Sequence, residues 1–203
     1  MDKKILDHLK TADPLLVPII ESTPPPVIHE GRDVYEYLLR SIVSQQLSVK
    51  AAETIFGRFL DLFDHKIPAA TDLQHIEIER LRAVGFSNAK AAYAKNVAAF
   101  FAENTNHDWD AESDEAIIKK LTAIKGVGKW TVEMILMFSL NRPDVLPVDD
   151  LGIQQAMRKL YNLSDPPKEL KKQMHEAAEP WRPYRTFACR YLWNWKDVKP
   201  DVS

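Results

Sequence analysis

Residues 121–132 read Leu-Thr-Ala-Ile-Lys-Gly-Val-Gly-Lys-Trp-Thr-Val, and the rest of the chain is best understood as a scaffold for this stretch. An amphipathic helical pattern runs up to Gly-Val-Gly, and a more apolar helical pattern begins directly after it. Gly126 and Gly128 permit a tight reversal of the backbone and leave its amides bare of side chains. The following helix begins with unpaired N–H groups and the positive end of its dipole. With Lys125 and Lys129 beside it, the turn is predicted to bind a phosphate.

Helical periodicity dominates the chain, and no stretch alternates between apolar and polar residues as a strand would. Four helices are predicted to begin after a capping side chain, at Asp33, Ser48, Ser87 and Ser113. Further helices are predicted at 5–9, 72–84, 151–161, 168–179 and 184–195. The remainder of residues 1–31 is expected to form an extended strap, because its prolines prevent a long helix. The sequence therefore predicts an all-α fold.

The last predicted helix has an apolar face made of Tyr184, Phe187, Ala188, Tyr191, Leu192 and Trp195. Trp193 falls on the opposite side of this helix. Because a large aromatic side chain off the core face needs another partner, Trp193 is a candidate for a binding site. Trp195 is predicted to belong to the core.

Composition and charge limit the classes of protein. The chain has 203 residues, 45% hydrophobic and 28% charged, with no apolar run near membrane-span length and no signal-peptide pattern, so no membrane association is expected. The single Cys189 excludes an internal disulfide and a four-cysteine iron–sulfur cluster. The six histidines lack metal-ligand spacing. We therefore predict no cofactor and no metal bound by side chains.

A formal net charge of −2 is low for a protein that binds nucleic acid. The charges are unevenly distributed, however, because lysines at 119, 120, 125 and 129 crowd the turn while acidic residues gather between 103 and 115. Backbone amides also bind phosphate without adding formal charge. We therefore expect modest, sequence-independent affinity for a phosphate backbone.

Asp149 and Asp150 directly precede the helix predicted at 151–161. The ordinary role of such a pair is to cap the helix. A carboxylate at this place is also stabilised as the anion, so that one Asp can cap while the other faces a substrate. Glu133 is a third candidate acid, although its place favours an interaction with the helix dipole.

The turn and the acidic pair together resemble the helix-hairpin-helix superfamily of DNA glycosylases. In that superfamily the hairpin grips the DNA backbone, and a Pro-rich loop and a catalytic Asp follow it. Residues 146–153, Leu-Pro-Val-Asp-Asp-Leu-Gly-Ile, supply this segment, and 20 positions separate Trp130 from Asp150, as expected in the alkyladenine branch. The resemblance covers about residues 34–195.

The resemblance implies a single helix-hairpin-helix glycosylase module over residues 1–203, with two helical lobes and the active-site cleft between them. The approximate lobes are 33–146, which contains the hairpin at 124–129, and 1–32 with 147–203. The implied catalytic residue is Asp150, because Asp150-Leu151-Gly152-Ile153 matches the family pattern of Asp, two residues and an aliphatic. Asp149 remains the alternative.

The resemblance also assigns binding roles. Trp130 and Trp193 match tryptophans that line the pocket for the extruded base, and Met134 stands where the best-known bacterial member has Tyr. Gln46 matches the residue that fills the gap left by the flipped nucleotide, and Leu47 is able to share this role, although a polar turn between helices explains both residues equally well. The implied backbone contacts to DNA are Lys125, Gly126, Val127, Gly128, Lys129 and Thr131. A monovalent cation at the carbonyls of Ile124 and Gly126 is a further expectation.

Position 130 predicts the reaction type. Relatives that also cut the DNA strand carry a lysine at this position, which forms a Schiff base, whereas this chain has Trp130. Without that amine the expected nucleophile is water. The implied function is therefore a monofunctional DNA-3-methyladenine glycosylase of base excision repair, which removes bases such as 3-methyladenine and 7-methylguanine.

Two alternatives stay open: a glycosylase for other damaged or mispaired bases, and a non-catalytic protein that binds DNA structures through the hairpin. The expected partner is double-stranded DNA with alkylated bases, bound by a monomer. The expected location is the cytoplasm, or the nucleoid or nucleus together with the DNA.

Overall fold

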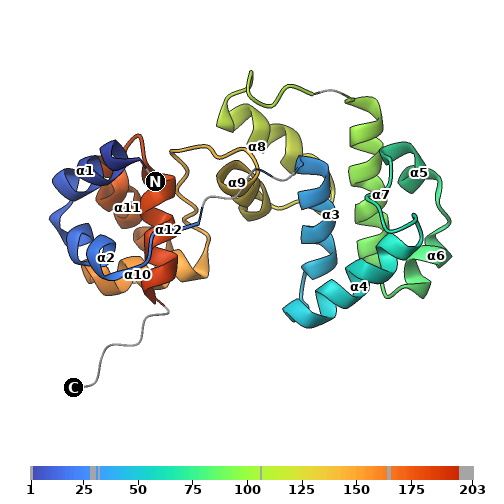
Figure 1. Cartoon of the computed structure of the whole chain (residues 1–203), viewed down its shortest axis with the longest axis horizontal. Coiled ribbons are helices and arrows are strands. Elements are labelled where there is room, and N and C mark those ends of the chain that lie inside the picture. Colours follow the sequence, from blue (N-terminus) through green and yellow to red (C-terminus); the bar gives the residue numbers. More distant parts are fainter. Residues whose placement is uncertain (1, 28–30, 32, 106, 164–165, 197–203) are drawn as a thin grey trace. The chain divides into compact units, whose positions relative to one another are not determined.

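The computed structural model describes residues 2–27, 31, 33–105, 107–163 and 166–196, and within these ranges the regular elements are all helices (Figure 1). The predicted all-α fold is confirmed. The chain divides into two compact units, which are described separately. The hairpin unit is Gly31–Ile135, and the terminal unit is Met1–Glu30 with Leu136–Ser203. The hairpin unit thus ends after Ile135, within a helix, whereas the sequence predicts that the corresponding lobe ends at residue 146.

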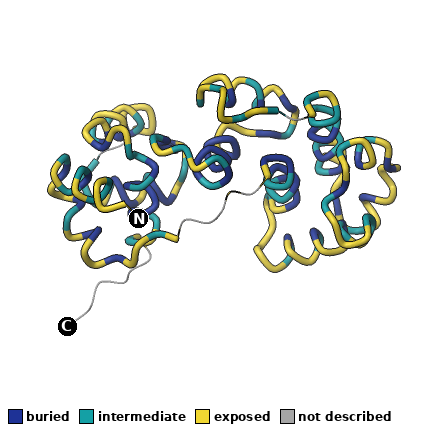
Figure 2. Tube along the Cα trace, turned by 45° about the horizontal axis from the view of Figure 1, so that its top comes forward, coloured by how far each residue is buried: buried dark blue, intermediate teal, exposed yellow. Residues whose placement is uncertain are grey.

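The hairpin unit is built around a long helix, α7 (Asn88–Glu103), which packs against α3 (Val34–Ser44), α5 (Ala70–His75) and α6 (Ile78–Ala83). Helix α4 (Val49–Asp61) packs on α3. Next come α8 (Asp114–Thr122) and α9 (Lys129–Phe138), the latter reaching the unit boundary. Buried residues lie on the inward faces of these helices (Figure 2).

All four predicted caps of the hairpin unit are confirmed. Asp33 accepts a hydrogen bond from the Glu36 amide at 3.1 Å, and the three serines make equivalent bonds at the starts of α4, α7 and α8. The single helix predicted over 72–84 is wrong, because the chain forms α5 and α6 instead. Ile76 takes an extended conformation between them with its side chain buried, and Lys95 Nζ donates to its carbonyl at 2.7 Å. A tertiary hydrogen bond therefore satisfies a backbone carbonyl at the point where the helix is interrupted.

The terminal unit contains α1 (Lys3–Ala12), the 3₁₀ helix η1 (Pro14–Leu16), α2 (Val17–Ser22), α10 (Leu151–Tyr161), α11 (Pro167–Ala178), η2 (Glu179–Trp181) and α12 (Arg185–Lys196). Helix α10 packs on α11 and α12, and α2 also contacts α12. Trp181 and Tyr191 are the largest side chains of its core, with exposures of 0% and 1%. No described helix combines the length and apolar character that a membrane span requires.

The prediction of an extended strap before residue 31 is wrong for residues 14–22, which form η1 and α2. Pro14 and Pro18 occupy the first turns of these helices, where a missing N–H breaks no helical bond. Asp13 caps η1 through the Leu15 amide, and its other carboxylate oxygen accepts bonds from Trp181 Nε1 at 2.8 Å and from the Tyr161 hydroxyl. The segment is therefore anchored to the core.

The prediction that Trp195 is a core residue is also wrong. The buried residues of α12 are Thr186, Ala188, Cys189, Arg190, Tyr191 and Leu192. Trp195 is half-buried, and Lys159 Nζ of α10 lies 4.4 Å from the centre of its ring. The last turn of α12 thus meets a long amphipathic side chain rather than an apolar surface.

Candidate active site

The two glycines of the turn between α8 and α9 have different structural requirements. Gly126 has a φ of +105°, and a Cβ there would lie 2.3 Å from Tyr93 Cγ, so that no side chain fits. A Cβ at Gly128 would meet nothing within 4 Å. Folding therefore explains Gly126, while the bare backbone at Gly128 suits the close approach of an external group.

Several polar groups of the turn are already used inside the hairpin unit. The Val127 amide donates to the Ile124 carbonyl at 3.0 Å, and the Val127 side chain is only 7% exposed. Gln45 Nε2 donates to the Gly126 carbonyl at 3.2 Å. The carbonyls expected to hold a cation, those of Ile124 and Gly126, thus each accept one hydrogen bond already. Val127 thus stabilises the turn through its backbone bond and its buried side chain.

The amides available to an anion lie at the start of α9. The first backbone bond of this helix runs from the Val132 amide to the Gly128 carbonyl at 3.2 Å. The amides of Gly128 and Lys129 precede it, at the positive end of the helix dipole. Lys125 is exposed beside them, and its carbonyl accepts a bond from Asn96 Nδ2 at 3.2 Å.

Three side chains of α9 differ from their expected roles or surroundings. Lys129 Nζ lies 3.1 Å from Glu133 Oε1, so that the predicted phosphate ligand is paired with a carboxylate. Glu133 lies in the second turn and is 3% exposed, and the expectation of a first-turn acid on the dipole is wrong. Thr131 is 8% exposed, and its Oγ1 lies 3.4 Å from Ser41 Oγ.

A cavity of about 280 Å³ adjoins α9 in the hairpin unit, and we call it the Trp130 cavity. Its lining residues are Tyr37, Arg40, Ser41, Ser44, Val49, Ala52, Glu53, Phe56, Trp130, Thr131 and Met134. Trp130 is 46% exposed, whereas Met134 is buried. Trp130 and Met134 therefore share one cavity, and its wall includes a partly exposed aromatic ring.

The turn between α3 and α4 holds the residues predicted to fill a gap in DNA. Gln46 is exposed and has a φ of +58°, a left-handed conformation that is uncommon for a residue other than glycine. Leu47 beside it is 38% exposed. A strained polar residue next to an exposed apolar one is typical of a contact site.

The carboxylate of Asp150 is held at the N-terminus of α10 in the terminal unit. Asp150 Oδ1 accepts a hydrogen bond from the Ile153 amide at 2.8 Å and another from Trp193 Nε1 at 2.8 Å. Asp149 pairs with Lys171 instead. The expected division, in which one Asp caps and the other is left for the substrate, is therefore wrong, because Asp150 itself is the cap and Asp149 is bound elsewhere.

Gly152 makes the close packing around Asp150 possible. A Cβ at this position would lie 3.1 Å from Asp150 Oδ1, from Trp193 Cδ1 and from Lys196 Nζ. Such contacts are tighter than ordinary van der Waals distances, so a larger residue would move at least one of these groups. The sequence pattern included Gly152 only as a spacer.

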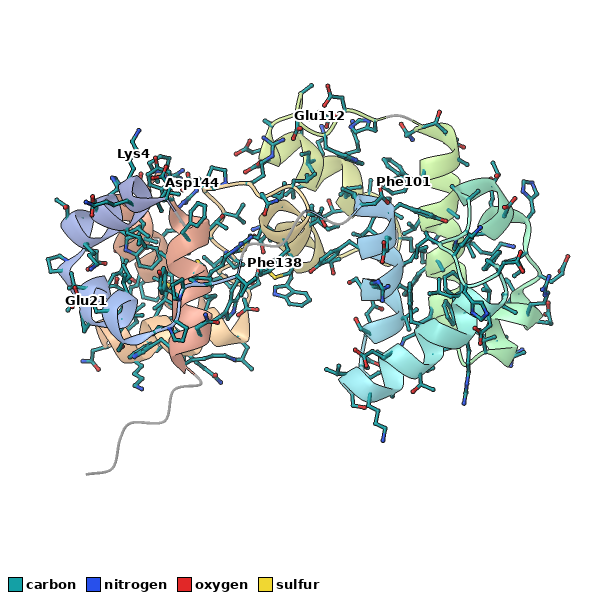
Figure 3. All side chains as sticks on the ribbon, viewed as in Figure 1. Lys4, Glu21, Phe101, Glu112, Phe138 and Asp144 are labelled. Atoms are coloured by element: carbon teal, nitrogen blue, oxygen red, sulfur yellow. The ribbon has the colours of Figure 1, made fainter. Side chains whose placement is uncertain are left out.

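Trp193 finds its partners within the protein. Besides its bond to Asp150, its indole stacks on the Phe138 ring, with centroids 5.7 Å apart and planes at 29°. It also lines a second cavity of about 310 Å³, the Trp193 cavity, together with Pro26, Val27, Phe138, Arg190 and Asn194. The Phe138 side chain is labelled in Figure 3. Part of the aromatic surface that was expected to hold a base is thus covered by Phe138.

The structure groups the predicted residues into two sets. Asp150 and Trp193 are bonded within the terminal unit, while Trp130 and Met134 share a cavity in the hairpin unit, which also carries Gln46 and Leu47. Sequence reasoning missed Phe138, Arg190 and Gln45. Only Arg190 left a signal, as a charged residue inside the otherwise uncharged run 186–193. The described residues hold no cluster of three or more His, Cys, Asp or Glu side chains able to bind a metal.

Comparisons with known proteins identify relatives of this chain in both sequence and structure. The chain is 38% identical over 182 residues to DNA-3-methyladenine glycosylase 1 of Schizosaccharomyces pombe, covering 88% of this chain and 79% of that protein. A crystal structure of a DNA-3-methyladenine glycosidase from Bacillus halodurans matches with a TM-score of 0.84 at 35% identity, over 97% of this chain and 91% of that one. A 3-methyladenine DNA glycosylase of S. pombe in complex with abasic DNA matches with a TM-score of 0.76 at 37% identity, over 94% and 95% of the two chains.

A family model for base excision DNA repair proteins matches residues 39–183, which include the glycine turn, Trp130 and Asp150. The chain belongs to the HhH-GPD superfamily of base excision DNA repair proteins.

Proposed function

We propose that this protein is a monofunctional DNA glycosylase that hydrolyses the N-glycosidic bond of alkylated purines. The observation that carries the proposal is the Asp150 carboxylate, bonded to the first turn of α10 and to the Trp193 indole at 2.8 Å each. The two N–H donors hold this carboxylate in one orientation at the start of α10. The names of the similar proteins, which are 3-methyladenine DNA glycosylases, support the same substrate class.

Binding to DNA is assigned to the glycine turn and to the turn after α3. The amides of Gly128 and Lys129 contact one phosphate at the N-terminus of α9, with Lys125 beside them. Gln46, with Leu47, fills the gap in the duplex once a nucleotide has been extruded. Extrusion costs a few kcal/mol, least for a damaged base.

The alkylated base itself supplies much of the chemical driving force. Alkylation at N3 or N7 of a purine places a positive charge on the base, which makes it a good leaving group without a strong general acid. As the glycosidic bond breaks, the sugar becomes oxocarbenium-like, and Asp150 stabilises that cation electrostatically and orients water. Trp193, which is bonded to Asp150, is proposed to contact the base, and cation–π attraction to an aromatic face contributes about 1–2 kcal/mol when desolvated.

We propose hydrolysis without strand cleavage, because position 130 is a tryptophan and the neighbouring Lys129 ammonium is engaged by Glu133 at 3.1 Å. An ammonium that is engaged in an ion pair is not placed to attack the sugar as a free amine would be. The proposed partner is damaged double-stranded DNA, bound by a monomer wherever that DNA lies in the cell.

The deciding assay measures free base released by the purified protein from duplexes that carry one 3-methyladenine, 7-methylguanine, hypoxanthine or uracil. Release of the alkylated purines above uracil is the expected result. Release of uracil alone would favour a glycosylase for other lesions. Tight duplex binding without release of any base would favour the non-catalytic alternative and overturn the proposal.

A further inference from the structure

Arg190 is a buried cation, and the described residues offset the cost of burying its charge with few hydrogen-bond acceptors. It is 5% exposed, and the residue lines the Trp193 cavity. Its Nη2 donates to the Met137 carbonyl near the end of α9, and the Phe138 ring lies 4.9 Å away. Among the described residues, Nε has no hydrogen-bond partner and no carboxylate forms an ion pair with the side chain. Burial lowers the pKa of the guanidinium, which nevertheless keeps its charge.

The bond to Met137 does not account for this burial. A guanidinium carries five N–H donors, and the helix end satisfies one of them. Arg185, on the same helix, shows the usual solution, because its Nε and Nη2 donate to the two Asp144 carboxylate oxygens at 2.7 and 3.0 Å. A buried charge without such a partner is costly unless a ligand supplies an acceptor.

The other residues that line the Trp193 cavity indicate the chemical character of that ligand. Phe138 and Trp193 provide aromatic surface, Pro26 and Val27 provide apolar surface, and the volume is about 310 Å³. Mostly apolar walls with a few directed polar groups are typical of sites for flat organic ligands. Trp193, which lines this cavity, also donates a hydrogen bond to the Asp150 carboxylate.

Building on the function proposed above, we propose that Arg190 is a specificity-determining residue which donates a hydrogen bond to the carbonyl oxygen at C6 of the extruded purine. Arginine bonded to the O6 and N7 edge of guanine is the commonest specific contact between a side chain and a base. Hypoxanthine and 7-methylguanine carry this carbonyl, whereas 3-methyladenine carries an amino group there. The guanidinium also repels a cationic base, and neutral hypoxanthine therefore benefits most.

The test is the variant Arg190→Met, which keeps the length of the side chain and removes its charge and donors. Single-turnover excision of hypoxanthine should fall about tenfold or more relative to that of 3-methyladenine. Excision of 3-methyladenine should stay equal or rise, because the repulsion is gone. A purely structural role would slow both reactions in the same proportion, and an unchanged ratio would overturn the assignment. Arg182→Met, at an arginine outside the cavity, is the matched control and should leave the ratio unchanged.

A second measurement on the unaltered protein decides the matter if Arg190→Met does not fold. Free hypoxanthine and free adenine differ at C6, and their binding can be followed by quenching of tryptophan fluorescence. Hypoxanthine should bind about tenfold more tightly or better, and equal affinities would contradict the role of Arg190. Failure of the unaltered protein to release any base would overturn the proposed glycosylase activity, while this binding comparison still tests Arg190.

Discussion

At the scale of single residues, the carboxylate oxygen Oδ1 of Asp150 combines two tasks. It closes the first turn of α10 and accepts the indole N–H of Trp193, a residue 43 positions away. Because asparagine caps helices about as well as aspartate does, charge and capping can be separated by a single substitution.

We expect Asp150→Asn to keep the fold and the affinity for damaged duplex, while excision of 3-methyladenine falls by about 10²-fold or more, since a neutral amide does not stabilise a cationic sugar. Single-turnover kinetics and a thermal melt measure the two effects. Asp149→Asn is the matched control, because the Asp149 carboxylate pairs with Lys171, and it should retain most of the activity. A larger loss for Asp149→Asn would transfer the catalytic role to Asp149.

Trp193→Phe tests whether the indole N–H positions the carboxylate. The substitution keeps an aromatic ring against Phe138 but removes the bond to Asp150, and hydrogen bonds to charged groups contribute about 1.5–3 kcal/mol. Excision of every lesion should therefore fall roughly tenfold or more, without a matching loss of Tm. Trp195→Phe, on the same helix and away from Asp150, should leave excision intact. Equal rates for the two variants would show that the bond is not used in catalysis.

At the scale of elements, the two glycines of the turn between α8 and α9 separate folding from binding. Gly126→Ala should lower the free energy of unfolding by about 1 kcal/mol or more, because alanine is disfavoured at positive φ and its Cβ meets Tyr93. Gly128→Asp should leave the fold intact, since the position is open and an acid is favourable at a helix N-terminus. It should weaken binding to damaged and undamaged duplex equally. Unchanged duplex affinity of a folded Gly128→Asp would show that this turn does not hold DNA.

In the turn between α3 and α4, a single residue, Gln46, allows the effect on stability to be separated from the effect on activity. Gln46→Gly should stabilise the protein slightly or leave its stability unchanged, because the left-handed conformation costs a larger residue about 1–2 kcal/mol. Excision should nevertheless fall, since the side chain that fills the gap in the duplex is lost. Asn162→Gly, at φ +51° after α10, is the control for backbone strain and should not change excision. Full activity of Gln46→Gly would show that Gln46 serves only the conformation of the turn and does not contact DNA.

At the scale of the whole molecule, the reaction should stop at the abasic site. Treatment with borohydride during turnover should trap no covalent DNA adduct and yield no strand cleavage, because no amine stands at position 130 and Lys129 is paired with Glu133. Gel electrophoresis of a labelled duplex measures both products. A stoichiometric adduct that disappears in Lys129→Gln would identify Lys129 as a nucleophile and the enzyme as bifunctional.

The amino-acid sequence by itself was enough for the all-α fold, the caps at Asp33, Ser48, Ser87 and Ser113, and the family. These features depend on residues a few positions apart, because a cap bonds the amide three residues later and helical periodicity repeats within two turns. A helix predicted from local periodicity over residues 72–84 is wrong for the same reason, because the carbonyl at the interruption, that of Ile76, is bonded by Lys95, a residue 19 positions away.

Only the tertiary structure decided which groups meet at the candidate site. The bond between Trp193 and Asp150, the stacking of Phe138 and the burial of Arg190 join residues of α9, α10 and α12 that the sequence keeps up to 55 positions apart. Periodicity places Trp193 off the core face, which is wrong for that side of α12, because Thr186 and Cys189 on the same side are buried. It also does not reveal the partner of Trp193, and it gives no warning that Trp195 is left half-buried. Such pairings follow from how helices pack in three dimensions, since a helix face is defined locally but its neighbour is chosen by the fold.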